Sequence, residues 1–392
     1  MNGKRERILA LDLLRGLFLL VIIVDHLSLF PNLFEIFSGR GHLWSSAAEG
    51  FFLISGTLVG YIYGPRMSVA PARTSIKIWK RALELYCYSV TTSFVFLWWG
   101  NHVSQGAKPG LWVHPPIREM VEKVLTLRYV YGWTDFLTHY VVYMLVAPLA
   151  VYLLSRRKSW LLVVGSLAVW SHRGAYMDKA WQLLFMAGIL LGYYLPYLET
   201  KAKLMSVLRQ KTMTWTIYGF AGLVYIASGV AIRIPEYVSD NNLTSGRLYD
   251  FSQPLIRFHD RTLVLFDKNT LGSGRVLVSF LWFTALYIVF RRNETRIHRW
   301  SKGVLEAFGK VSLYVYVVHA FVLFALHLVL PVNMGFIANT IVTAWSAAIV
   351  YECIQYRDKI VHYWRKKPLQ RRIMRERMPQ NSSLLYLAVG QE

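Results

Sequence analysis

The chain is poor in cysteine and in charged residues. Its 392 residues include only two cysteines, Cys87 and Cys353, and both lie inside apolar stretches. Neither a disulfide framework nor a metal site with cysteine ligands is therefore expected. Charged residues make up 17% of the chain and hydrophobic residues 55%. This balance argues against a large soluble protein and is typical of an integral membrane protein.

Acidic residues are scarce relative to basic ones. The chain has 22 aspartates and glutamates against 44 lysines and arginines, which gives a net charge of +22. A nucleic-acid site would need those basic residues gathered on one water-facing surface. Here they form short clusters between apolar runs, so we expect no nucleic-acid partner. Such clusters suit the inner surface of a membrane, where they meet anionic membrane lipids.

Long apolar runs dominate what is present. The first run, 8–30, follows Lys4, Arg5 and Arg7. It is too long for a signal peptide and has no small-residue cleavage site, so we interpret it as a retained helix. A spanning helix needs roughly 20 mainly apolar residues. The sequence therefore predicts an all-α integral membrane protein of about ten transmembrane helices, of which the fifth is short: 8–30, 46–64, 82–99, 136–155, 159–172, 180–198, 213–233, 271–290, 308–330 and 335–356.

The distribution of basic residues predicts the orientation of these helices. If the N-terminus is cytoplasmic, most lysines and arginines fall in segments on the cytoplasmic side, as membrane topology requires. We therefore expect a multi-pass protein of the cytoplasmic (inner) membrane with both termini in the cytoplasm. Residues 1–356 would form a single membrane domain. Residues 357–392 would form a basic tail that lies on the membrane or is partly disordered.

Two outer loops are predicted to be long, at roughly 100–135 and 234–270. Long loops in a compact protein tend to be functional. These contain aromatic residues beside charged ones, among them Trp112, His114 and Trp133 in the first loop and His259 in the second. Aromatic faces beside charges suit a carbohydrate. An ordinary lid at the membrane interface fits any single one of these residues equally well.

The first helix carries ionisable residues where lipid is expected, and such residues are costly unless they are functional. Arg15 and His26 are eleven positions apart, so they project from the same face, roughly 16 Å apart along the axis. Arginine can hold phosphate or carboxylate in bidentate fashion, and histidine can accept a proton near neutral pH. Alternatively, Arg15 pairs with Asp12, and Asp25 and His26 only cap the helix.

Two further helices carry polar residues. Glu49 precedes the sequence FFLISG and could orient His26 or take part in proton transfer, or it could simply be hydrated. Gly56 and Gly60 are four residues apart, which indicates close helix packing. His319 lies in the sequence GKVSLYVYVVHAF, and a single histidine in an apolar helix is usually a packing residue.

Together these residues resemble a known family. The pattern of Arg15, ten intervening residues, His26 and then FFLISG resembles the acyltransferase-3 superfamily of membrane acyltransferases. The nearer resemblance is to the OpgC family, whose members place succinyl groups on osmoregulated periplasmic glucans. The matching segments follow the family order across most of the chain: LDLLRGLFLLVIIVDH (11–26), SSAAEGFFLISGTLVGYIYG (45–64), TDFLTHYVVYMLVAPLAVYLL (134–154), AWQLLFMAGILLG (180–192), DKNTLGSGRVLVSFLWF (267–283) and FGKVSLYVYVVH (308–319).

The resemblance implies an acyl-CoA-dependent O-acyltransferase that moves succinyl or acetyl from cytoplasmic acyl-CoA to a hydroxyl of an extracytoplasmic glycan. No bound cofactor and no metal are implied. The arginine and histidine of the family correspond to Arg15 and His26, and Asp25 keeps the acidic residue beside the histidine. Further matched positions have less defined roles: Glu49, Asp135, Gln182, Lys268, Arg275, Ser312 and His319. Two departures, Ser273-Gly274 and His139, put the identity of the acyl group and of the acceptor in doubt.

The resulting hypothesis assigns a role to each residue. His26, oriented by Asp25 or Glu49, would act as general base or briefly carry the acyl group. Arg15 would hold CoA from the inner side, while Lys268 and Arg275 would bind an acyl carboxylate or a phosphate. The alternatives are a transporter or flippase for a glycan or lipid-linked precursor, and a non-catalytic subunit or sensor. The absence of an evident internal repeat and the intact Arg15 and His26 argue against them.

Overall fold

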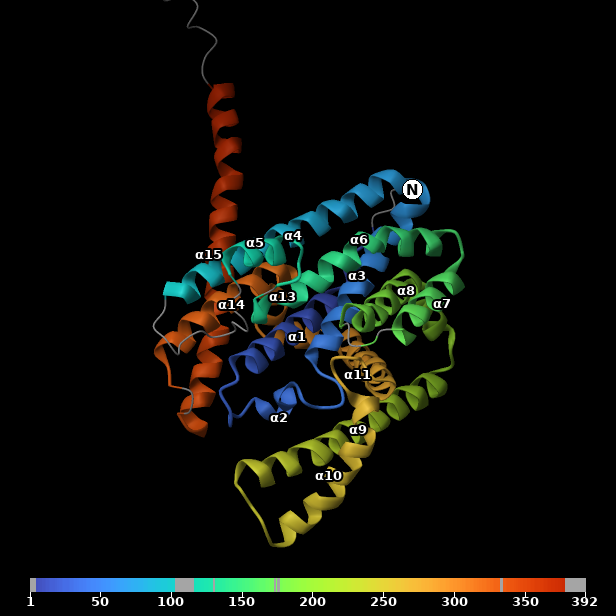
Figure 1. Cartoon of the computed structure of the whole chain (residues 1–392). Coiled ribbons are helices and arrows are strands. Elements are labelled where there is room, and N and C mark those ends of the chain that lie inside the picture. Colours follow the sequence, from blue (N-terminus) through green and yellow to red (C-terminus); the bar gives the residue numbers. More distant parts are fainter. Residues whose placement is uncertain are drawn as a thin grey trace, which may run out of the picture.

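The computed structural model describes residues 5–102, 116–129, 131–172, 174, 177–331 and 334–377, and within these ranges every regular element is a helix. The helices follow one another along the chain as shown in Figure 1. Their bounds are α1 (Leu9–Leu27), α2 (Glu35–Ser38), η1 (Gly39–Gly41), α3 (Ala47–Val69), α4 (Pro71–His102), α5 (Ile117–Leu125), η2 (Gly132–Thr134), α6 (Phe136–Ser155), α7 (Ser159–Ser171), α8 (Met177–Leu204), α9 (Val207–Asp240), α10 (Arg247–Phe266), α11 (Ser273–Arg292), α12 (Glu294–Trp300), α13 (Val304–Lys310), α14 (Ser312–Val329) and α15 (Phe336–Arg377).

Each predicted apolar segment lies on a helix, which confirms the all-α class. Six stretches of the described chain are long and apolar enough to cross a membrane, by length and composition: Gly132–Ser155, Lys179–Leu204, Val207–Asp240, Ser273–Arg292, Ser312–Val329 and Phe336–Trp364. Several helices of this kind indicate a multi-pass membrane protein. Ten crossings and two cytoplasmic termini stay predictions.

The structure differs from the sequence-based expectation at two segments. The predicted outer segment 234–270 is mostly helical, because α9 continues to Asp240 and α10 then fills most of the remainder. Its position on the outer side stays a prediction. These two helices form a hairpin that projects from one end of the molecule (Figure 1). The predicted tail is also helical at its start, because α15 continues past residue 357 to Arg377. Lysine, arginine and glutamine are good helix formers, so a polar composition does not end a helix.

Some expectations fall outside the described residues. Trp112 and His114 of the first predicted loop are among them, as are residues 378–392 of the tail. In the described part of that loop, α5 and η2 lie between residues 117 and 134.

Glycines bring the central helices close together. Gly56 and Gly60 of α3 face the backbone of α8, where an added Cβ would collide with the carbonyls of Phe185 and Ile189. On α8, Gly192 faces the carbonyl of Thr57 in the same way. The predicted packing role of the α3 glycines is therefore confirmed.

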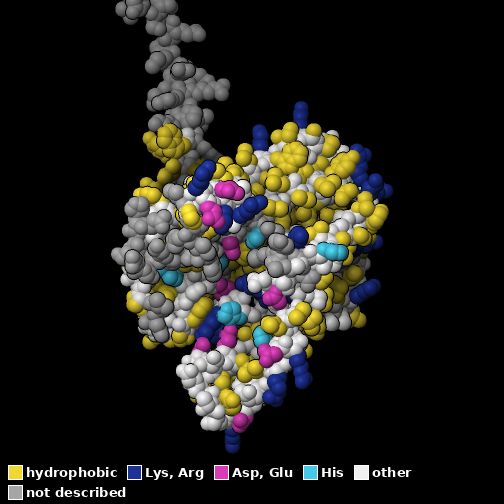
Figure 2. All heavy atoms as spheres, viewed as in Figure 1, with side chains coloured by type: hydrophobic (Ala, Val, Ile, Leu, Met, Phe, Trp, Pro, Cys, Tyr) yellow, Lys and Arg dark blue, Asp and Glu magenta, His cyan; other side chains and the backbone are white. Residues whose placement is uncertain are grey.

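Helix α1 lies in the middle of the bundle and is held there from several sides. Its Gly16 faces the carbonyl of Leu305 in α13, and Gly309 of α13 faces the carbonyl of Asp12. It also packs against α3, α11 and α14. Figure 2 shows hydrophobic side chains over the upper part of one face, and histidine and acidic side chains nearer its middle. The polar residues of α1 are thus carried into a mostly apolar body.

Candidate active site

The C-terminal end of α1 meets α14 through two histidines. The Nδ1 atom of His26 lies 3.1 Å from the Nε2 atom of His319, and the ring centroids are 5.3 Å apart. His319 is only 1% exposed. A buried imidazole needs a hydrogen-bond partner, and each ring provides one for the other. The single histidine that the sequence suggested as a packing residue is therefore half of a pair.

Either tautomer of His319 fits its contact with His26. We assign the proton of His319 to Nδ1, the nitrogen that does not contact His26, which leaves Nε2 as the acceptor. The Nδ1–H of His26 then donates to His319. This arrangement leaves the lone pair of His26 on Nε2, the nitrogen that can accept a proton from a substrate.

Asp25 and Lys268 lie beside this histidine pair. A Cβ placed on Gly41 would stand 3.4 Å from Asp25 Oδ2 and 3.6 Å from Lys268 Nζ. The other carboxylate oxygen of Asp25 is buried and accepts no hydrogen bond. Gly41 has a φ of +71°, a conformation that favours glycine. The turn at Gly41 thus lets the chain pass close to both charged groups.

The Lys268 ammonium is the centre of positive charge at this end of the bundle. It acts electrostatically on Asp25 and His26, and also on Glu49 and Asp135. Among the described residues it makes neither a hydrogen bond nor an ion pair. Its backbone carbonyl accepts from the Trp181 indole N–H at 3.0 Å. The chain is therefore fixed at Lys268 while its charged group stays available.

The turn that carries Lys268 is stabilised by the preceding residue. One carboxylate oxygen of Asp267 accepts from the backbone N–H and from the hydroxyl of Thr270, each at 2.6 Å. Partial burial raises the pKa of the Asp267 carboxyl, but these hydrogen bonds outweigh it and hold the pKa below its usual value. Asp267 is thus ionised at neutral pH and keeps its acceptor role.

Asp135, one of the further matched positions that we expect to bind substrate, is the N-cap residue of α6. Its Oδ1 accepts from the backbone N–H of Phe136 at 2.7 Å, an N-cap interaction that satisfies one of the free donors of the helix. The residue is partly exposed, and Lys268 acts on it electrostatically. Asp135 therefore belongs to the same charged cluster as Asp25 and Lys268. Its hydrogen bond to the start of α6 holds the carboxylate in that position.

Glu49 and Arg275 are engaged with each other. Arg275 Nε lies 2.5 Å from Glu49 Oε1, and the side chains are 3% and 0% exposed. The second oxygen of Glu49 accepts from the backbone N–H of Ser46 at 2.8 Å, which completes a capping box at the start of α3. Arg275 also donates to the carbonyls of Leu43 and Phe266 at 3.1 Å each.

This ion pair changes the roles expected of its members. No described contact joins Glu49 to His26, and the burial of Glu49 is opposite to a hydrated position. His319 occupies the orienting position that the sequence assigned to Asp25 or Glu49. Arg275 is ion-paired with a carboxylate inside the protein, although its Nη2 atom has no hydrogen-bond partner. Of the two cations that the sequence assigned to an acyl carboxylate or a phosphate, Lys268 is therefore the one without an ion pair.

Arg15 lies deeper along α1 and is not paired with Asp12. Asp12 instead accepts from Arg7, and one of those bonds measures 3.0 Å. The Nε of Arg15 is buried without a hydrogen bond, and its guanidinium lies 5.6 Å from the ring of Phe51. Arg15 lines a narrow cavity with Arg81 and Tyr140, among others. The proposed Asp12–Arg15 pair is therefore wrong.

Tyr316 of α14 borders both the Arg15 cavity and the histidine pair. It lines the Arg15 cavity, and its ring centroid lies 5.0 Å from that of His319. Sequence reasoning missed this residue, although its spacing from two marked residues could have found it. Ser312, Tyr316 and His319 are four and three residues apart, so they share one face of a helix.

The two remaining marked residues serve the helix framework. Gln182 donates to the Ser166 carbonyl and accepts from the Ser166 hydroxyl, both at 2.8 Å, and so ties α8 to α7. Ser312 is buried at the first residue of α14. No described contact brings either side chain to the His26–His319 pair.

The fold and this site together define a helical, multi-pass membrane protein with a charged cluster and a histidine pair at one end of its bundle. The chain belongs to the OpgC family, since the family model described as OpgC protein matches residues 7–360. That confirms the resemblance to OpgC and suggests a protein that modifies glucans at a membrane. The wider acyltransferase-3 placement stays a prediction. No curated protein and no solved structure matches the chain.

Proposed function

We propose that the protein is an acyl-CoA-dependent O-acyltransferase of the cytoplasmic membrane. It would transfer a succinyl or acetyl group from cytoplasmic acyl-CoA to a hydroxyl of an extracytoplasmic glycan, such as an osmoregulated glucan. The observation that carries the proposal is the 3.1 Å contact between His26 and His319 beside the available ammonium of Lys268. Family membership supports the same class of reaction.

The reaction begins at Nε2 of His26. This nitrogen takes the proton of a sugar hydroxyl while the oxygen attacks the thioester carbonyl, so that a C–O bond forms and the C–S bond breaks. The proton then passes from His26 to the departing CoA thiolate. His319 positions His26 by accepting its Nδ1–H. In this proposal Asp25 and Lys268 flank the reacting groups, and Glu49 is not part of the proton transfer.

Arg15 and Lys268 would bind different parts of the substrates. Arg15 lies towards the N-terminal end of α1 and has a buried Nε without a partner, which suits an anionic or amide group of CoA. Lys268 lies at the His26 end, where it would bind the free carboxylate of a succinyl group or a phosphate on the glycan.

The test measures transfer in membranes that contain the full-length protein. Radiolabelled succinyl-CoA or acetyl-CoA is supplied with an extracted surface glycan, and wild type is compared with His26→Ala and Arg15→Ala. His327→Ala is the matched control, because His327 lies on α14 but bonds to its own helix, at the Leu323 carbonyl. Label should enter the glycan with wild type and the control only.

Other outcomes have a definite meaning. Near-normal transfer by folded His26→Ala would exclude His26 as the base. No transfer by folded wild type with either donor would favour the transporter or flippase alternative, or a role as a non-catalytic subunit. The donor that is used would identify the acyl group.

A further inference from the structure

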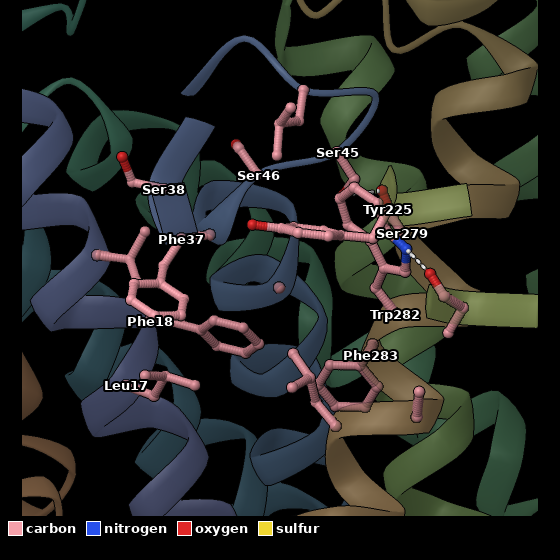
Figure 3. A pocket seen from close by; sticks show the side chains of 17 residues that line it. Leu17, Phe18, Phe37, Ser38, Ser45, Ser46, Tyr225, Ser279, Trp282 and Phe283 are labelled. Atoms are coloured by element: carbon pink, nitrogen blue, oxygen red, sulfur yellow. Dashed lines mark hydrogen bonds between the residues drawn. The ribbon is translucent and has the colours of Figure 1, made fainter. Parts of the chain in front are cut away.

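A second cavity lies on the other side of α1 and has no role in the proposed reaction. Its volume is ≈ 380 Å³, and it is enclosed by α1, α9, α11 and the segment that leads into α3. Ligand sites of this size are typical for small molecules. Figure 3 shows its side chains, which include Leu17 and Phe18 from α1, Tyr225 from α9 and Phe283 from α11.

The cavity is polar at one end and apolar at the other. The hydroxyls of Ser38, Ser45 and Ser46 lie at one end in Figure 3, whereas Leu17 and Phe283 lie at the opposite end. The Ser45 hydroxyl is 2.9 Å from that of Ser279. This change from polar to apolar lining along the cavity matches a molecule with a polar group followed by a hydrocarbon chain.

The cavity sits at a depth where lipid is the solvent. Its lining residues occupy the middle of α9 and α11, both of which are long and apolar enough to span a membrane. On the outer face of α9, beside the cavity, Leu223 and Ile226 are 63% and 64% exposed. Leu17 and Leu286 line the cavity and remain partly exposed, so it is not sealed from the outside of the bundle.

The direction of this change also agrees with a bilayer. The serines belong to the segment 38–46, which follows the His26 end of α1, and the apolar residues lie near the middle of the helices. A lipid in the leaflet on the His26 side has its headgroup at that end and its chains towards the midplane. We propose that the cavity binds one hydrocarbon chain of a membrane phospholipid from that leaflet.

The bound chain would support the segment that borders the active site. Ser38 lines the cavity and lies near the Asp25 carboxyl. Gly41, which passes beside Asp25 and Lys268, follows in the same segment. The chain would thus fill the space behind this segment, and its binding does not depend on acyl transfer.

Photo-crosslinking tests the proposal without an activity assay. Full-length protein is reconstituted in vesicles of phosphatidylethanolamine and phosphatidylglycerol that contain a phospholipid with a diazirine near the end of one chain. After illumination, labelled residues are identified by mass spectrometry. Adducts are expected on Phe18 and Phe283, which are only 6% and 3% exposed, because lipid outside the bundle cannot reach them.

Two variants fill the cavity, and a neighbouring one does not. Ala221→Phe and Ala285→Leu add atoms at buried lining positions. Each should lower the yield of the buried adducts roughly tenfold, because displacing about two methylene groups weakens binding by that factor. Gly222→Phe is the matched control, because Gly222 has nothing within 4 Å of an added Cβ. It should leave the yield unchanged.

The proposal is overturned if adducts form only on exposed positions such as Leu223, or if folded filling variants label Phe18 and Phe283 as strongly as wild type. If one variant fails to fold, the other decides the result. A protein that labels as expected but transfers no acyl group would leave the lipid site intact and contradict the proposed reaction alone.

Discussion

At the scale of single residues, the hydrogen bond between His26 and His319 is the contact on which the proposed chemistry depends. His319→Ala removes the acceptor of the His26 Nδ1–H. We expect kcat to fall about 10²-fold, within the range of general-base contributions, with KM for the glycan little changed. His319→Gln should recover part of the loss, because its amide oxygen can accept the same proton. Steady-state kinetics with both substrates would measure the effect.

A residue that is only structural would behave differently. If His319→Ala raised KM as much as it lowered kcat, or if the glutamine variant gave no recovery, the positioning role would be wrong. His327→Ala again serves as the control, since it removes a histidine from α14 without touching His26.

The Glu49–Arg275 pair makes a separate prediction about stability. Both side chains are almost fully buried, so removal of one partner leaves a buried charge without its counterion. Glu49→Gln or Arg275→Met alone should cost about 3–5 kcal/mol. The double variant should cost clearly less than the sum, because it buries no unpaired charge. Thermal unfolding in detergent would test this, and a loss in the double variant equal to the sum of the two single losses would contradict the pairing.

The sequence predicted part of the site at this scale. The helical spacing placed Arg15 and His26 on one face, because both positions belong to one helix with a fixed period. It could not place His319 against His26, since the two residues are separated by 293 positions. Whether Arg275 binds a ligand or Glu49 was undecidable for the same reason, because the partner is set by how α3 and α11 pack.

At the scale of helices, α3 and α8 depend on glycine contacts. Gly192→Ala would place a methyl group against the backbone of Thr57, which cannot move aside as a flexible side chain could. We expect a loss of about 1–3 kcal/mol from overpacking. Gly219→Ala in α9 is the control, because nothing lies within 4 Å of its added Cβ. It should stabilise the protein slightly, since alanine favours helix.

Thermal unfolding of both variants would measure these changes in stability. A Gly192→Ala protein as stable as wild type would mean that α3 and α8 are further apart than the structure places them.

The sequence predicted some of the helix packing but not every helix. The α3 glycines were recognisable from their spacing of four, whereas α10 was not. Its apolar residues alternate with charged ones, and a search for apolar runs therefore interprets it as a loop.

At the scale of the whole molecule, hydropathy and function conflict in α1. This helix lies in the centre of the bundle, but Asp12, Arg15 and Asp25 lie within its 19 residues. It is not among the six stretches that satisfy length and composition for a membrane span. The three charged residues that indicate a site are also what excludes α1 from these six stretches, so its predicted crossing stays a prediction.

A labelling experiment can decide the number of crossings. The chain has only two cysteines, both free, so Cys87→Ser and Cys353→Ser give a cysteine-free background. Ser68→Cys and Ser245→Cys then add single exposed thiols at the C-terminal end of α3 and between α9 and α10. Five predicted helices separate them, the third to the seventh, so they should lie on opposite sides of the membrane. A membrane-impermeant maleimide added to intact cells should label Ser245→Cys alone.

Because the two labelled positions are separated by an odd number of predicted helices, the result depends on whether the short fifth helix crosses the membrane. Helix α7 has only 13 residues, fewer than the roughly 20 that a full span needs. If α7 does not cross, Ser68→Cys and Ser245→Cys share a side and both thiols react alike. A third variant, Ser171→Cys at the end of α7, then locates the error. It should react from outside if α7 crosses and only after permeabilisation if it does not. If α7 does not cross, the basic cluster at 156–158 and the segment before α8 lie on the same side of the membrane. Helices α8 to α15 would then all have the opposite orientation to the predicted one.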